Sequence, residues 1–178
     1  MNEGTAYSRA VPKGRDVAMI HVESIGMIEH FVRIRRDGKR VEEHMDAEAM
    51  LALGWSPDKI VRIEWEADGA SHARDFVHGV LAKVAPDKSA IVLLEEGVDG
   101  SDLSVINPDG STRYEIANTH RVDGEVLTGN FAWFEPARNG SEHAIGLIFQ
   151  AQGAAGPEQY QFDLDLATGE VLEARITR

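Results

Sequence analysis

The sequence has no cysteine, which excludes disulfides, cysteine nucleophiles and cysteine-based metal sites at once. It also lacks a Gly-x-Ser-x-Gly nucleophile motif, a Gly-x-x-x-x-Gly-Lys phosphate loop and a Gly-x-Gly-x-x-Gly turn. No two histidines stand in a His-x-x-x-His spacing, so the usual helical zinc motif is missing as well. We therefore expect no cofactor and no metal ion, and the sequence singles out no catalytic residue.

Long apolar segments are also missing. The longest stretch without Asp, Glu, Lys, Arg or His is residues 144–157, and these 14 residues are too few to span a bilayer as a helix. Residues 1–15 are polar, contain three cations and lack the apolar core of a signal peptide. These absences predict a cytoplasmic protein of a bacterium, with no membrane partner and a flexible N-terminus over residues 1–15.

Positive charge is scarce. The chain has 18 Lys and Arg residues against 30 Asp and Glu residues, which gives a formal net charge of −12. Nucleic acid is not an expected partner, because binding to phosphates requires a cationic surface. The negative charge fits a basic protein partner, although solubility alone explains it equally well.

The sequence is rich in turn signals that separate short runs of alternating apolar residues. Gly follows Asp, Asn or Thr at seven places, where it can adopt a positive φ at low cost: Gly38, Gly69, Gly100, Gly110, Gly124, Gly140 and Gly169. Hairpins are predicted over residues 80–94, 103–116, 131–149 and 163–177, and a strand at residues 27–36 leads into the turn at Gly38. This pattern predicts a mainly β protein with residues 1–178 as a single antiparallel domain, built as a meander, a sandwich-like sheet or a propeller-blade-like sheet.

Two segments depart from the alternating pattern. Residues 46–54 begin with an N-cap aspartate, continue with strong helix formers and end in glycine, which predicts one short helix. Residues 71–84 have apolar side chains at a spacing that suits a helix, but a turn at residues 85–88 favours a strand that enters a hairpin. We favour the strand for residues 71–84, and the helix stays open.

Two hairpins resemble those of known protein families. Asp-Leu-Ser-Val-Ile-Asn-Pro-Asp-Gly-Ser-Thr-Arg-Tyr at residues 102–114 resembles hairpins of β-propeller blades. Leu-Asp-Leu-Ala-Thr-Gly-Glu-Val-Leu at residues 164–172 resembles the turn of quinoprotein propeller repeats. Small antiparallel proteins with such hairpins also occur among bacterial toxin-neutralising immunity proteins. The propeller resemblance implies antiparallel strands and no cofactor or functional residue, whereas the immunity-protein resemblance implies a protein partner.

The densest acidic patch is the strongest candidate for a partner-binding site. It consists of Glu95, Glu96, Asp99 and Asp102, with no Lys or Arg between them. A recognition loop for a cationic partner is one interpretation, and a solvated turn is the other. A calcium site fits less well, because the Asp-x-Asp-x-Asp-Gly order of a calcium loop is missing.

An aromatic segment supplies candidate apolar anchors. Strand alternation places Phe131 and Trp133 on one face and Phe134 on the other. If one of these faces is exposed, Trp133 or Phe134 could anchor a protein partner. Burial of both faces is equally compatible with the pattern.

Other charged groups have plainer interpretations. Five cations lie within eight residues: Arg33, Arg35, Arg36, Lys39 and Arg40. They could bind nucleic acid, a phosphate or an acidic protein, but we favour a charged edge strand that prevents aggregation. Two same-face carboxylate pairs, Glu64 with Glu66 and Asp163 with Asp165, could perform acid–base chemistry if one member were buried. We favour the solvent face of an amphipathic strand for both pairs.

These observations lead to three hypotheses on function. The first is an acidic, non-catalytic immunity or inhibitor protein that neutralises a basic toxin domain by electrostatic steering and occlusion of the toxin's site. The partner-binding residues would be Glu95, Glu96, Asp99, Asp102, Trp133 and Phe134. The second hypothesis is an enzyme or small-ligand-binding domain built from scattered histidines and carboxylates. The third is a structural or assembly module that oligomerises through an edge strand.

Overall fold

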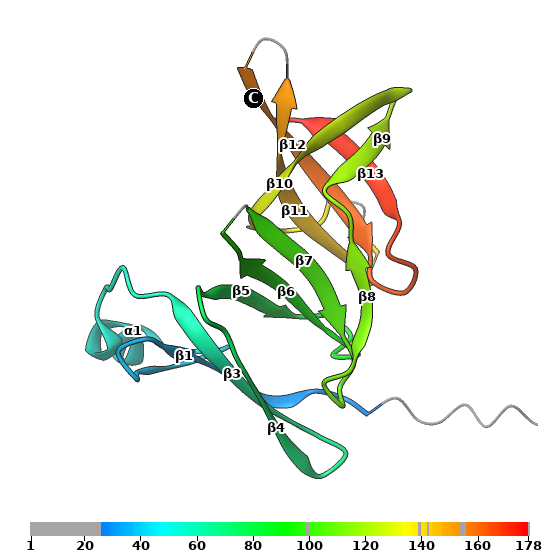
Figure 1. Ribbon diagram of the computed structural model, residues 1–178. Helices are drawn as coiled ribbons and strands as arrows, with labels where there is room; N and C mark the ends of the chain where they lie inside the picture. Colours follow the sequence, from blue (N-terminus) through cyan, green and yellow to red (C-terminus); the bar gives the residue numbers. More distant parts are fainter. Residues whose placement is uncertain (1–25, 99, 139, 142, 154–155, 178) are drawn as a thin grey trace, which may run out of the picture.

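Three antiparallel sheets follow one another along the molecule (Figure 1). The computed structural model describes residues 26–177 apart from 99, 139, 142 and 154–155. Within this range, thirteen strands and one helix are present. The predicted flexible N-terminus, residues 1–15, lies outside the described residues.

The sheets are formed by strands that are close in sequence. Sheet one has the order β2-β1-β3-β4, with β1 at Glu29–Arg35, β2 at Arg40–Glu42, β3 at Ile60–Ala67 and β4 at Ala70–Asp75. The helix α1, Ala47–Leu53, lies between β2 and β3 in the chain. Sheet two has the order β5-β6-β7-β8, with β5 at Val80–Val84, β6 at Ile91–Glu96, β7 at Ser101–Ile106 and β8 at Thr112–Ile116. Sheet three has the order β13-β12-β11-β10-β9, with β9 at Thr119–Val122, β10 at Glu125–Glu135, β11 at Ala144–Gly153, β12 at Gly156–Asp165 and β13 at Val171–Ile176.

Sheet two is the middle layer, and β6 is buried on both of its faces. Val92 and Leu94 belong to a core cluster shared with sheet three, whereas Ile91 and Leu93 belong to a second cluster shared with sheet one. All four side chains are at most 2% exposed. Full burial of each such side chain stabilises the fold by roughly 1.5–3 kcal/mol. An uninterrupted apolar run therefore suits this strand, because neither of its faces meets water.

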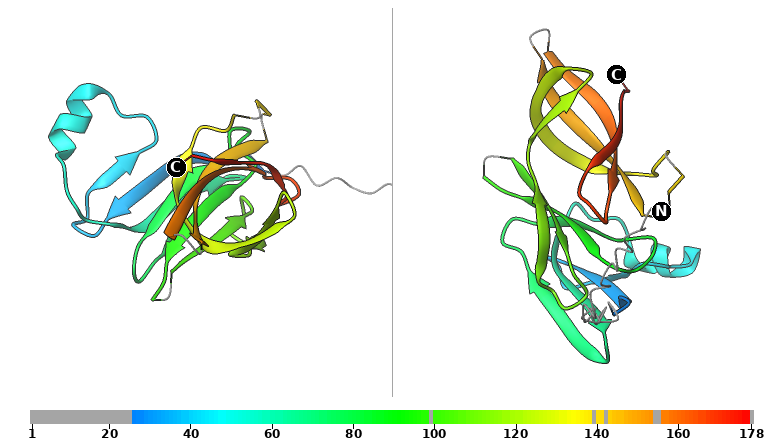
Figure 2. Two further views of the ribbon diagram at one scale, coloured as in Figure 1. Left: turned by 90° about the horizontal axis from the view of Figure 1, so that it is seen from above. Right: turned by 90° about the vertical axis from the view of Figure 1, so that its right-hand side faces the viewer.

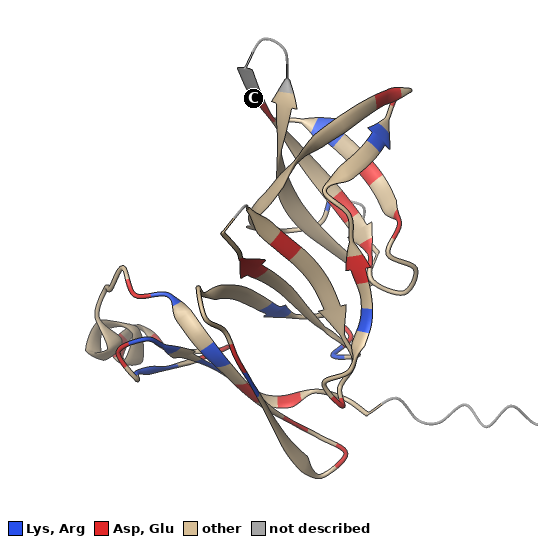
Figure 3. Cartoon of the chain, viewed as in Figure 1, with Lys and Arg blue, Asp and Glu red and all other residues tan. Residues whose placement is uncertain are grey.

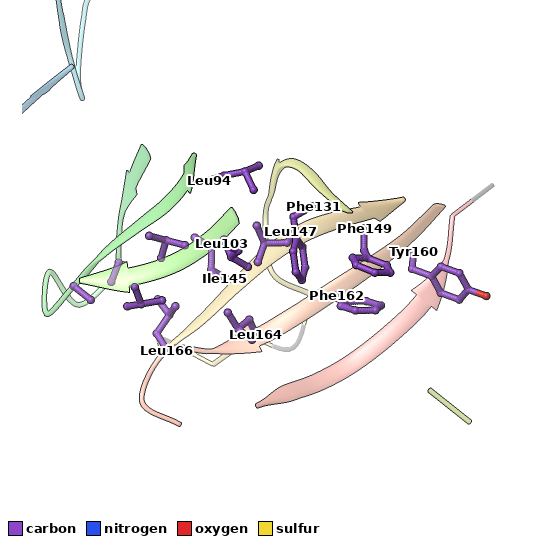
Figure 4. Close-up of a cluster of buried hydrophobic side chains, with 14 of the residues drawn as sticks. Leu94, Leu103, Phe131, Ile145, Leu147, Phe149, Tyr160, Phe162, Leu164 and Leu166 are labelled. Atoms are coloured by element: carbon purple, nitrogen blue, oxygen red, sulfur yellow. The ribbon is translucent and has the colours of Figure 1, made fainter. Parts of the chain in front are cut away.

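The core between sheets two and three combines aliphatic side chains with a group of aromatic rings (Figure 4). Phe149 and Phe162 stack with their ring centroids 4.9 Å apart, and Phe131 meets Phe149 edge-on at 5.0 Å. His120 from β9 packs edge-on against all three phenylalanines, at centroid distances of 5.1–5.5 Å. The buried Nε2 of His120 has no hydrogen-bond partner among the described residues.

Hydrogen bonds from β8 tie sheet two to the turn between β12 and β13. The hydroxyl of Tyr114 donates to the carbonyl of Leu166 at 2.9 Å, and burial raises the pKa of Tyr114 to about 12. The neighbouring Arg113 donates to the carbonyls of Leu166 at 3.2 Å and Ser89 at 2.7 Å. These bonds fix the position of sheet three relative to sheet two.

The predicted fold class is confirmed, and so are the hairpins and the helix. Each of the four predicted hairpins is an antiparallel strand pair. The side chain of Asp46 caps α1 by accepting from the amide of Ala49 at 2.8 Å. The helix ends at Gly54, whose φ of 70° is disfavoured for residues with a side chain.

Residues 71–84 form strands, as favoured, but two short ones. The chain leaves sheet one after Asp75 and enters sheet two at Val80. Between them, Phe76 is buried in the core that these two sheets share, and Gly79 has a φ of 122°. The apolar spacing that suits a helix therefore comes from a crossing between sheets.

The resemblance to propeller blades is not supported. The hairpin at residues 102–114 lies in sheet two, and the hairpin at residues 164–172 lies in sheet three. Sheet three curls into a half-barrel, which is plain in the view from above (Figure 2, left). The two hairpins thus belong to sheets of different curvature and strand number.

No helix in the described part of the chain is long and apolar enough to cross a membrane.

We expect His120 to contribute to the pH dependence of stability. Burial lowers the pKa of His120 below its ordinary value of 6.5, so the native state resists a proton that the unfolded chain accepts. This contribution to stability is present above about pH 6.5 and is lost as the pH falls through the folded pKa. Urea denaturation at about pH 7.5 and about pH 5.5 should show a smaller acid-induced loss for His120→Gln than for the wild type. Equal losses in the two proteins would contradict this role.

Candidate functional site

The predicted acidic patch lies at the end of the β6–β7 hairpin. Glu95 and Asp102 are directly opposite each other across the two strands. Glu96 forms an ion pair with Lys59, the residue that precedes β3, so its charge is partly neutralised within the molecule. Asp99 lies outside the described residues. The fold therefore brings Glu95 and Asp102 together, whereas Glu96 binds Lys59 within the protein.

A bulge in β10 decides where the predicted aromatic anchors point. The register of β10 against β11 shifts between Phe131 and Trp133, so one extra residue lies in β10. Phe131 is buried and Phe134 packs against the same core, whereas Trp133 is 37% exposed. The prediction that Phe131 and Trp133 share a face is therefore wrong, because a bulge reverses the alternation of side chains after it.

Ala132 of β10 lies beside the acidic patch. A shallow hollow of about 270 Å³ is lined by Leu81, Leu94, Glu96, Gly97, Gly100, Ser101 and Ala132. Ala132 precedes Trp133 in the chain, and the indole N–H of Trp133 donates to Glu135 at 2.9 Å. A carboxylate hairpin and an exposed indole thus come from neighbouring strands, which is an arrangement that can meet a protein surface.

The five cations of the basic cluster mostly bind the chain itself. Only Arg40 lies on β2, the edge strand of sheet one, whereas Arg33 and Arg35 lie on β1, which pairs with β2 on one side and β3 on the other, so the charged-edge interpretation holds for Arg40 alone. Arg35, which is only 7% exposed, donates to the carbonyl of Gly54 at 3.0 Å, and Lys39 donates to the carbonyl of Leu53 at 2.8 Å. Arg36 donates to the carbonyl of Val77 at 3.1 Å. Arg35 and Lys39 thus satisfy carbonyl groups where α1 ends, which also suits the negative end of the helix dipole.

A groove over sheet one is a second concave surface, larger than the hollow beside the acidic patch. Its volume is about 910 Å³, and charged side chains from β2, β3 and the segment after β2 line it together with His30, His44 and His72. An ion-pair ladder crosses this face of the sheet: Glu64 accepts from Arg40 and from Arg62 at 2.9 Å each, and Arg62 also binds Asp75. The hydrogen bond from Arg62 holds the pKa of Glu64 below its usual range, which is opposite to what a general acid needs.

Other candidates for chemistry are engaged in the fold. Asp163 is buried, and it accepts from the backbone amide of Arg138 at 2.8 Å. The prediction that Asp163 lies on a solvent face is therefore wrong, because sheet three curls and the 136–138 segment covers this strand. Ser56 and Lys59 have a Ser-x-x-Lys spacing, but the Ser56 hydroxyl accepts from the amide of Asp58 at 3.1 Å and Lys59 pairs with Glu96. Within the described residues, no group of three or more His, Asp or Glu side chains is arranged to hold a metal ion.

The exposed surface of α1 is not among the sites that the sequence predicts. None of the residues of α1 is buried, although the helix is mostly alanine, leucine and methionine. Leu51 is 83% exposed, Met50 is 55% exposed, and Trp55 just after the helix is 91% exposed. The signal that could have revealed this surface is charge: residues 41–58 contain five acids and no Lys or Arg, directly after the basic cluster.

Comparison with known proteins gives one informative match. The sequence matches no protein-family model and no curated protein. The fold matches a chain of the solved structure described as "Structure of Tne2 in complex with Tni2", with a TM-score of 0.77 and 30% sequence identity. The match covers 85% of this chain and 100% of that chain.

We expect Asp37→Asn to destabilise the protein at neutral pH and to have little effect in acid. The hydrogen bond from Arg35 lowers the pKa of Asp37 to about 2, well below the value of about 3.9 for an unfolded chain. The stabilising contribution is therefore complete above about pH 5 and is lost as the pH falls towards 2. Thermal unfolding at a series of pH values should show the curves of the wild type and the variant converging. A deficit that stays constant down to about pH 2 would rule out this role of the ionised pair.

Proposed function

We propose that this chain is an immunity protein with the role that Tni2 has towards the toxin Tne2. The chain belongs to the same protein family as the matched chain of the Tne2–Tni2 complex. It would act in the bacterial cytoplasm and would bind a toxin domain and neutralise it. The observation that carries the proposal is the match itself, which spans the whole of the other chain at 30% identity.

The charge of the chain supports a basic toxin as the partner. The net charge is −12, and most of the cations in the basic cluster donate to backbone carbonyls within this protein. Acidic residues therefore outnumber the cations that are free to meet an approaching protein, and Figure 3 shows Asp and Glu at positions along all three sheets. A complementary positive toxin would be attracted at a distance and would associate faster than an uncharged one.

The proposed mechanism is occlusion. A toxin domain with a cationic active-site region would be steered to a carboxylate surface and then covered by it. Glu95, Glu96, Asp99 and Asp102, with Trp133 as the exposed aromatic, remain the candidate surface predicted from sequence. Phe134 contributes less in this proposal, because it packs against the core.

We expect this chain to protect cells from a cognate toxin, and the product of the neighbouring gene is the candidate to test. Expression of that toxin alone should stop growth, and co-expression of this chain should restore growth and yield a complex that co-purifies through a tag on either partner. The matched control is an unrelated acidic protein of similar size and charge, which should not protect. The proposal would be falsified if the toxin domain arrested growth equally with and without this chain while both proteins were soluble.

We expect the charges of the β6–β7 hairpin to affect mainly the association rate. Glu95→Gln with Asp102→Asn should lower the association rate constant by about tenfold at low ionic strength, because rim charges act through steering. Asp123→Asn with Glu125→Gln makes the same change of charge at the β9–β10 turn and should have a smaller effect. Biolayer interferometry at two salt concentrations measures both variants. Equal effects of the two double variants would show that only net charge matters and that the predicted patch is not part of the interface.

A further inference from the structure

The helix α1 and its flanking residues form an arm whose exposed apolar side chains are not covered by any other part of the described chain. We call residues 42–58 the acidic arm; the segment leaves sheet one after β2 and returns at β3. In the described structure none of the residues of α1 is buried. The exposed fractions of Leu51 and Trp55 are 83% and 91%, the values expected for side chains in contact with water alone.

The arm is held in place at its ends rather than through its side chains. Asp46 caps the first turn of α1, while Lys39 and Arg35 bind the carbonyls of Leu53 and Gly54. A helix of seven residues is not stable in water by propensity alone, so these bonds are what keeps α1 folded. The apolar side chains are therefore left available for another molecule.

The charges of the arm indicate the chemistry of that molecule. The arm carries five acids, Glu42, Glu43, Asp46, Glu48 and Asp58, and no Lys or Arg. None of these five forms an ion pair with another described residue. An apolar centre with an acidic rim is complementary to an apolar cleft whose rim carries lysine and arginine.

We propose that the acidic arm is the docking element for the toxin, with Met50, Leu51 and Trp55 entering an apolar cleft that is bordered by basic residues. This inference rests on the proposed function. Exposed tryptophan next to aliphatic side chains is the composition typical of the residues that dominate protein interfaces. A second copy of this chain is a poorer occupant, because it would bring the same acids against the arm.

The arm adjoins the patch predicted from sequence. Lys59 directly follows the arm, and its ion pair with Glu96 joins the start of β3 to the end of β6. The two acidic surfaces therefore meet at one salt bridge, and the arm adds to the predicted patch the apolar anchor that Phe134 does not provide. In this arrangement the carboxylates of the β6–β7 hairpin steer the toxin, and the arm holds it.

The test compares the affinity of the wild type and of an arm variant for the purified toxin domain encoded beside this chain. Leu51→Ser with Trp55→Ser should weaken binding by about 30-fold or more, the effect of losing one hot-spot residue. The thermal unfolding of the free protein should be unchanged, because both side chains are exposed. Val126→Ser with Ile176→Ser is the matched control: these side chains are 59% and 67% exposed on sheet three, and binding should change by less than about twofold.

Two further measurements address the contact itself. In a Trp133→Phe background whose toxin affinity has been measured, Trp55 is the exposed one of the two remaining tryptophans, because Trp65 is 3% exposed. After the toxin's own emission is subtracted, the emission should shift to shorter wavelength when the toxin is added, because the indole of Trp55 leaves water. Glu42→Gln, Glu43→Gln and Asp58→Asn together should lower the association rate by about tenfold and flatten its dependence on salt. Asp46 is kept in this variant because it caps the helix.

The outcomes separate the docking inference from the proposed function. If the wild type binds the toxin and the Leu51→Ser, Trp55→Ser variant binds within twofold of it, the arm is not the docking element and the proposed function stands. If the wild type does not bind the toxin, both fail. If light scattering shows that the wild type self-associates and that this variant is monomeric with unchanged toxin affinity, the arm binds a second copy and the inference is overturned.

Discussion

Burial of the middle sheet on both of its faces is the constraint on which the rest of this structure depends. β6 contributes Ile91 and Leu93 to one core and Val92 and Leu94 to the other. Sheets one and three are therefore held by the same strand from opposite sides. Because each sheet needs its apolar face covered, neither outer sheet is complete without sheet two. The hydrogen bonds of Tyr114 and Arg113 then fix sheet three against this centre.

Function is expected on the surfaces that lie outside the two cores. These surfaces differ in whether their charged side chains are paired within the protein. On sheet one, arginines and carboxylates pair with one another, and the hydrogen bond from Arg62 lowers the pKa of Glu64. The cations of the β1–β2 hairpin bind carbonyl groups, including those at the end of α1. Glu95 and Asp102 of the β6–β7 hairpin form no ion pair among the described residues, and neither do the acids of the arm, whereas Glu96 pairs with Lys59 and Asp46 caps α1. The proposal of a basic protein partner rests on these unpaired acids and on the family relationship to a chain of a two-protein complex.

Some predictions are wrong because they depend on features that a local sequence pattern does not reveal, such as a bulge or a contact with a distant segment. The alternation of β10 is regular in sequence, yet one bulge between Phe131 and Trp133 exposes the indole and turns Phe134 towards the core. Asp163 alternates with apolar neighbours as a solvent-facing residue should, yet the 136–138 segment lies over it and supplies a hydrogen bond. The sequence predicts the helix at residues 46–54 together with its aspartate cap. It does not predict the exposure of this helix, because an apolar helix normally packs against another element of the fold.

By itself, the sequence determined the fold class, the hairpins, the turn glycines and the capped helix. These depend on residues a few positions apart, through side-chain alternation, positive φ at glycine and local hydrogen bonds. Only the tertiary structure decided that β6 is buried on both faces, that the basic cluster binds the end of α1, and that Met50, Leu51 and Trp55 have no partner within the described chain. These features depend on which sheets meet and on where a strand bulges. Contacts between residues far apart in the chain determine which sheets meet and where a strand bulges. The spacing of residues within one segment does not reveal these contacts.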